Sequence, residues 1–95
     1  MGRLDDKVAI VTGAGHGIGA AIAARFAREG ARVVVDDVDG ERAEEIARAI
    51  GDAAIPFCAD VSKSEDVERL FETCVQRFGA PEVLDARGEQ ALDVL

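Results

Sequence analysis

The feature that most constrains the fold of this 95-residue chain is a glycine-rich stretch near its N-terminus, TGAGHGIG at residues 12–19. An apolar run at residues 8–11 precedes it, and an amphipathic run at residues 18–29 follows. This context indicates a strand, a tight turn and a helix start, where glycines permit positive φ and let a bulky anion approach the backbone. Because the first turn of a helix offers unpaired N–H groups and a positive dipole end, the stretch predicts a diphosphate cradle.

The remaining chain alternates between short apolar runs and amphipathic runs. Strands are expected at residues 7–11, 32–36 and 54–59, with helices at 18–29, 41–50 and after a capping box at residues 62–65. This pattern predicts an α/β, Rossmann-like, three-layer βαβαβα fold. Its parallel sheet would be short, with strand order 3-2-1, an abortive fourth strand at residues 82–84 and the third strand at an edge.

Helical spacing predicts which side chains face the core. In the first helix these are Ile18, Ile22, Ala23, Phe26 and Ala27, and in the third they are Val67, Leu70, Phe71, Cys74, Val75 and Phe78. The two cysteines, Cys58 and Cys74, are too few and too far apart for a zinc site, so no metal site is expected. Both are expected to be buried, reduced thiols.

The glycine spacing separates two classes of dinucleotide-binding turn. The common pattern G-x-G-x-x-G is not met, because Ile18 stands where its third glycine belongs. The pattern present is T-G-x-x-x-G-x-G, which resembles the cofactor turn of the short-chain dehydrogenase/reductase family. The resemblance runs from about Leu4 to Leu84 and implies an NAD(H)-binding turn. Its cofactor-binding residues would be Gly13, Gly15, His16, Gly17, Ile18 and Gly19.

The second strand ends in a pair of acids, Asp36 and Asp37, roughly 20 residues beyond the turn. A carboxylate there can accept hydrogen bonds from both ribose hydroxyls of an adenosine, and it would repel a 2′-phosphate. The resemblance assigns this role to Asp37. Asp36 is expected to point elsewhere, since neighbouring strand residues face opposite ways. The alternative for Asp37 is a solvated turn acid.

Cofactor preference and the adenine site also rest on the resemblance. Family members that take NADP often carry a basic residue where this chain has His16 or Val38, and histidine is mostly neutral at pH 7, so NAD is favoured over NADP. Asp60 and Val61 match an acid-and-apolar pair that binds adenine in the family. The alternative, that Asp60 starts the third helix, is less favoured because Ser62 can supply that cap.

The resemblance stops before the catalytic part of the family. A serine, a tyrosine and a lysine four residues beyond the tyrosine form the family's proton relay, but this chain has no tyrosine and no asparagine, and its lysines are Lys7 and Lys63. No catalytic residue is therefore assigned. We expect a partial dinucleotide-binding domain at residues 1–84 and a divergent tail at residues 85–95. Truncation or a shifted reading frame after Leu84 would explain that tail.

Two alternatives to an oxidoreductase fragment remain open. One is a standalone, non-catalytic nucleotide-binding or regulatory module. The other is a nucleotide-sugar epimerase, although His16 occupies the place of that class's middle glycine. The net charge of −8 disfavours nucleic acid and anionic membranes as partners. The absence of a long apolar run or a signal-like N-terminus predicts a cytoplasmic protein. A short fourth strand would leave the first strand exposed and open to self-association.

Overall fold

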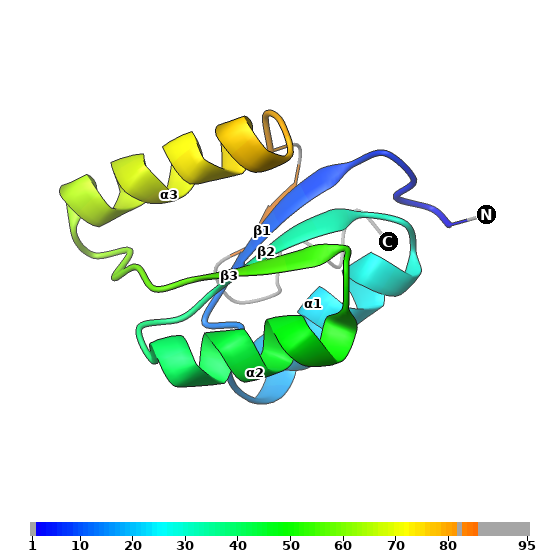
Figure 1. The fold of residues 1–95 in the computed structure, drawn as a ribbon, viewed down its shortest axis with the longest axis horizontal. Helices are drawn as coiled ribbons and strands as arrows, with labels where there is room; N and C mark the ends of the chain where they lie inside the picture. The colour runs from blue at the N-terminus through cyan, green and yellow to red at the C-terminus, as the bar shows by residue number, and fades with distance from the viewer. Residues whose placement is uncertain (1, 82, 86–95) are drawn as a thin grey trace.

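The computed structural model describes residues 2–81 and 83–85. The elements alternate as the sequence predicts: β1 (Val8–Thr12), α1 (Gly17–Arg28), β2 (Arg32–Asp36), α2 (Gly40–Ile50), β3 (Ala54–Phe57), α3 (Ser64–Arg77) and β4 (Val83–Asp85). All strand pairs are parallel, and the sheet order is β3-β2-β1-β4 (Figure 1). The Rossmann-like fold and the 3-2-1 order are confirmed. Residues 86–95 of the expected tail lie outside the described residues, so the domain boundary at Leu84 stays a prediction.

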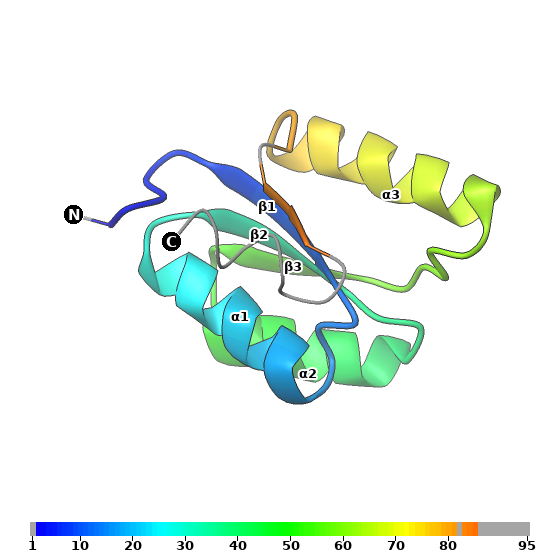
Figure 2. The same ribbon diagram turned by 180° about the vertical axis from the view of Figure 1, so that it is seen from behind.

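The central strands β1 and β2 are buried on both faces, which explains their continuous apolar sequence. Helices α1 and α2 cover one face of the sheet and α3 covers the other (Figures 1 and 2). Alternate residues of each strand therefore enter different cores. Ala9, Val11, Val33 and Val35 pack with the helices α1 and α2 around the fully buried Phe26. On the other face, the core beneath α3 consists of Val8, Ile10, Val34, Ala59, Leu70 and Cys74.

The ends of α1 and α2 follow local sequence signals. Gly51 comes directly after α2, and Gly30 follows the C-cap residue Glu29 of α1; their φ values of 105° and 100° favour glycine. At the start of α2, Asp39 is the N-cap, and its side chain accepts a hydrogen bond of 3.3 Å from the Arg42 N–H. The two glycines let the chain turn back to the sheet after each helix, and the Asp39 cap fixes where α2 begins.

Three burial predictions are wrong. Ile18 and Val75 were expected to face the core, but they are 73% and 52% exposed, because each lies at the margin of its helix's apolar stripe. Ile18 belongs to the first turn of α1, beyond the edge of the sheet that the rest of the helix covers. Cys58 is exposed rather than buried, since β3 ends at Phe57 and leaves Cys58 in the following loop. Cys74 is buried as expected.

The expectation that β1 is an exposed strand is also wrong. β4 pairs with β1 through Ala9↔Val83, Ile10↔Leu84 and Val11↔Asp85, and Figure 2 shows it beside β1. The pairing extends to Asp85, one residue beyond the fourth strand predicted at residues 82–84. β1 thus has a paired strand on each side, and self-association stays a prediction. Within the described residues, no helix is long and apolar enough to cross a membrane.

A pair of substitutions in α1 tests the packing. Phe26→Ala should destabilise the fold by about 3–5 kcal/mol, because it empties a fully buried aromatic site. Ile18→Ala, the matched control in the same helix, should change the free energy of unfolding by less than about 0.5 kcal/mol. Urea unfolding followed by circular dichroism measures both. Equal losses would contradict the observed helix orientation.

Candidate functional site

The carboxyl ends of the parallel strands meet at one edge of the sheet. The register places Thr12 beside Asp36 and Asp36 beside Phe57, so the chain leaves β1, β2 and β3 at the same level. Hydrogen bonds continue past the strand ends, from the Ala14 N–H to the Asp36 carbonyl at 2.9 Å. This edge contains a hollow of about 320 Å³ lined by Thr12, Gly13, Asp36, Asp37, Val38, Ala59, Asp60 and Val61.

The glycine turn needs glycine for both conformation and space. Gly13 and Gly17 have φ of 67° and 47°, in the left-handed region. A Cβ at Gly19 would lie 2.3 Å from the Gly13 carbonyl oxygen, too close for any side chain. The turn and the first turn of α1 therefore pack backbone against backbone, and this leaves the helix N-terminus open to solvent.

The N-terminus of α1 presents positive polarity without compensation. His16 is the N-cap residue, and its side chain makes no capping hydrogen bond. The first turn contains no acidic residue, so the N–H groups there keep the positive end of the helix dipole. The His16 side chain is 61% exposed, and its Nε2 lies 4.0 Å from Asp39 Oδ2. This arrangement suits an anionic ligand.

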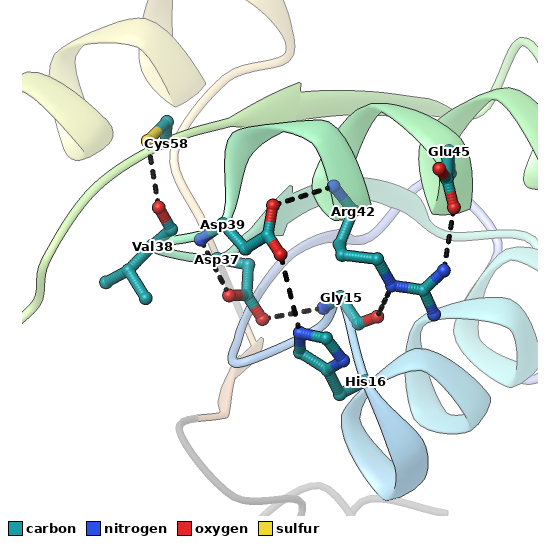
Figure 3. A network of polar contacts seen from close by, with 8 residues as sticks. All are labelled: Gly15, His16, Asp37, Val38, Asp39, Arg42, Glu45 and Cys58. Atoms are coloured by element: carbon teal, nitrogen blue, oxygen red, sulfur yellow. Dashed lines mark hydrogen bonds and ion pairs between the residues drawn. The ribbon is translucent and has the colours of Figure 1, made fainter.

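Asp37 is buried beside the turn and connects two segments of the site. One carboxylate oxygen, Oδ2, accepts a hydrogen bond of 2.9 Å from the Gly15 N–H, and Oδ1 accepts another from the Asp39 N–H at the same distance (Figure 3). Each oxygen of an ionised carboxylate can accept more than one bond, so both keep capacity for a ligand donor. The alternative of a solvated turn acid does not hold, because Asp37 is only 5% exposed.

Asp36 points away from the turn, as strand alternation predicts. Its side chain is 1% exposed, and Oδ1 accepts a hydrogen bond of 2.9 Å from the Ala59 N–H. Burial raises the pKa of Asp36 to about 7, and the negative charges of Asp37, Asp66 and Asp60 add to that rise. The Ala59 hydrogen bond opposes the shift without cancelling it.

The predicted capping box at residues 62–65 does not form. The N-cap of α3 is Lys63, without a side-chain hydrogen bond. Ser62 instead donates from its hydroxyl and its N–H to Asp60 Oδ1, at 2.6 and 2.9 Å. The hydroxyl bond, followed by the N–H bond, lowers the pKa of Asp60. The adenine role of Asp60 was favoured because Ser62 was expected to cap the third helix, and that expectation is wrong. Asp60 and Val61 do line the hollow.

One contributor to the site was missed from the sequence. Arg42, in the first turn of α2, donates from Nε to the Gly15 carbonyl oxygen at 3.1 Å and from a terminal nitrogen to Glu45 at 2.7 Å (Figure 3). Long helical side chains point toward the helix N-terminus, which here faces the glycine turn. That direction was the available signal. Among the described residues, no group of three or more acidic, histidine or cysteine side chains could hold a metal ion.

Of the predicted site residues, Gly13, Asp37, Asp60 and Val61 meet around the hollow, and Gly15 is bonded to Asp37. His16, Gly17, Ile18 and Gly19 form the N-cap and first turn of α1 beside them. This arrangement defines the chain as a Rossmann-like α/β unit with a glycine turn at the carboxyl edge. The family model for short chain dehydrogenases matches residues 7–86, and the chain belongs to this family.

Curated relatives agree with that assignment. The chain is 39% identical to a sorbitol dehydrogenase of Cereibacter sphaeroides and 40% identical to a galactitol 2-dehydrogenase of Agrobacterium fabrum. Each match covers 86% of this chain and 32% of the relative. The chain therefore spans about a third of the length of the curated relatives it matches.

Solved structures extend the likeness to three dimensions. A 3-ketoacyl-(acyl-carrier-protein) reductase from Brucella melitensis, complexed with NADH, matches at a TM-score of 0.84 and 47% identity, over 85% of this chain and 33% of that one. A hydroxysteroid dehydrogenase from Escherichia coli matches at 0.83 and 36%, over 86% of this chain and 36% of its own. The fold of the chain is thus shared with about a third of each of these two proteins.

The buried acid Asp36 predicts a pH dependence of stability. Its pKa is about 7 in the folded protein and ordinarily 3.8, so the folded protein binds this proton more tightly than the unfolded chain. The free energy of unfolding should therefore fall as pH rises from about 4 to about 7, by up to about 4 kcal/mol, and then level off. Asp36→Asn should remove this fall.

Urea midpoints at pH 5 and 8 measure the effect, with the exposed Asp52→Asn as the control for a lost charge. Glu29, Asp60 and Asp66, whose pKa values are lowered from 4.5 and 3.8, keep their charges at pH 5 and at pH 8 and do not confuse the comparison. A wild-type chain and an Asp36→Asn variant with the same change between pH 5 and 8 would contradict the assignment.

Proposed function

We propose that this chain binds NAD(H) as the cofactor-binding part of a short-chain dehydrogenase. The observation that carries the proposal is the meeting of Gly13, Asp37 and Asp60 around one hollow, with the Gly15 N–H bonded to Asp37 just before the N-cap of α1. A cradle that binds an anion, an acceptor for ribose hydroxyls and an adenine site match, in this order, the parts of a dinucleotide. The NADH complex of the Brucella melitensis reductase, 47% identical, supports the same reading.

The surface beside the hollow supports a ligand with flat rings. The large exposed apolar side chains of the described residues are Ile18, Val38, Val61 and Val75, and the first three lie at this edge of the sheet. In the proposed complex Val61 would pack on the adenine and Ile18 would contact the cofactor. The N–H groups of Gly17, Ile18 and Gly19 would hold the diphosphate, and Gly13 would give it room.

The acidic environment of the proposed ribose site supports NAD over NADP. Asp37 would accept hydrogen bonds from the ribose hydroxyls and repel a 2′-phosphate. Val38 offers no charge, and the exposed His16 lies nearest to another acid, Asp39. Arg42 is a nearby cation, but its guanidinium already bonds the Gly15 carbonyl and Glu45. The Glu45 carboxylate thus balances the charge of Arg42 beside the proposed ribose site.

The oxidation of alcohols or reduction of carbonyls is proposed for the whole protein, not for these residues alone. When bound, the nicotinamide ring would accept or donate the hydride. The described residues would bind and orient the cofactor, while the proton relay would come from the remaining two thirds that the relatives possess. Absence of tyrosine from the 95 residues supports the alternative that this chain by itself is a non-catalytic nucleotide-binding module.

A cytoplasmic location forms part of the same proposal. Cys58 is an exposed free thiol and Cys74 a buried one. Unpaired thiols persist in reducing compartments, where disulfides are rare. The edge of acidic side chains and the net charge of −8 also support a small-molecule partner rather than a nucleic acid.

Calorimetric titration of the chain with NADH and with NADPH tests the proposal. NADH should bind more tightly, because the Asp37 carboxylate bonds ribose hydroxyls and repels the extra phosphate. Asp37→Ala should weaken NADH binding about tenfold or more and bring the two affinities together, since hydrogen bonds to charged groups contribute about 1.5–3 kcal/mol. Asp37→Asn, which keeps the size and one acceptor, should fall between.

Asp52→Ala is the matched control, because it removes the same charge from the turn after α2, where the side chain is exposed. It should leave the ratio of the two affinities unchanged. Equal binding of NADH and NADPH by the unmodified chain would reject the preference, and binding of neither would reject the function.

A further inference from the structure

We propose that Arg42 is a positioning residue for the dinucleotide site, acting through the Gly15 peptide and not through contact with the cofactor. The expected effect on cofactor binding rests on the proposed function, whereas the contacts of Arg42 are observed in the structure. Arg42 comes from α2, outside the glycine turn, and lies 27 residues from the carbonyl that it contacts. It thus joins two elements that the sequence separates.

The Gly15 residue is held at both its polar groups. Its N–H donates to Asp37 Oδ2 at 2.9 Å, and its carbonyl oxygen accepts from Arg42 Nε at 3.1 Å (Figure 3). The N–H bond is buried and the carbonyl bond is partly buried. A charged donor and a charged acceptor make these bonds stronger than neutral ones. Gly15 therefore serves the site as a fixed support, with its N–H already used by Asp37.

Steric contact adds to the hydrogen bonds. A Cβ at Gly15 would lie 2.8 Å from Arg42 Cβ and 2.9 Å from Asp37 Oδ2. The Arg42 stem and the Asp37 carboxylate thus lie on the same side of the glycine and confine it between them. Since His16 follows directly and is the N-cap of α1, a fixed Gly15 also fixes where the helix begins.

The guanidinium is itself fixed. A terminal nitrogen bonds Glu45 at 2.7 Å, one turn further along α2. The Arg42 N–H donates to Asp39, the N-cap of the same helix. Because Asp37 also accepts a hydrogen bond from the Asp39 N–H, release of Arg42 would loosen the glycine turn while the ribose acceptor stays in place.

Arg42→Met tests the proposal, because it keeps the stem that packs on Gly15 and removes the donor. It should weaken NADH and NADPH binding alike, about five- to tenfold, the cost of one hydrogen bond of roughly 1 kcal/mol. The ratio of the two affinities should not change. Arg42→Lys, which can still donate, should recover most of the loss. Glu44→Gln, which removes an exposed charge from the same helix and leaves the Gly15 bond intact, should bind NADH as the unmodified chain does.

Hydrogen exchange of the Gly15 amide in the free chain provides a readout without cofactor. Exchange should be faster in Arg42→Met and unchanged in Glu44→Gln, with the urea midpoints of the two variants equal. Unchanged Gly15 exchange, or a loss of affinity for NADPH alone, would overturn the proposal. A loss of folding in Arg42→Met that Arg42→Lys does not reverse would also overturn it. If the unmodified chain binds neither cofactor, the proposed function fails, whereas the exchange result still decides the positioning role.

Discussion

The parallel pairing of β1 with β2 is the constraint on which the rest of this structure depends. Its register runs from Val8↔Arg32 to Thr12↔Asp36, so both strands release the chain at the same level. The glycine turn and the acid pair then emerge side by side, although Gly15 and Asp37 are 22 residues apart. Parallel strands require a crossover, and α1 provides it from the face where Phe26 is buried. Packing and site geometry therefore have one origin.

This edge of the sheet has a place of positive polarity and, beside it, a place of negative polarity. The first turn of α1 has no acid and keeps its positive polarity, whereas Asp36, Asp37 and Asp60 gather at the ends of β2 and β3. An anionic group is favoured at the first place and hydroxyl or amine donors at the second. The grouping of these carboxylates affects Asp36 most, since burial and the neighbouring charges raise its pKa to about 7.

Sequence patterns predicted the fold and most of the site because they reflect local constraints. Positive φ at Gly13 and Gly17, the Asp39 cap and the alternation of Asp36 with Asp37 are each decided within a few residues. One failed prediction had a local cause, and two others depended on tertiary contact. The Ser62 hydroxyl bonds the Asp60 carboxylate and does not cap α3, and β4 covers β1. Arg42 was missed because no spacing rule links an α2 side chain to the carbonyl of a distant turn.

Backbone amide chemical shifts, recorded while the chain is titrated with NADH, test the assignment of the site most directly. We expect the largest changes at the carboxyl edge of the sheet, in residues 13–19, at Asp37 and at Asp60 and Val61. The hollow between α1 and α2, lined by Ala24, Ile46 and Ile50 among others, should not respond. Saturable shifts confined to that second hollow, or none at the glycine turn, would contradict the assignment.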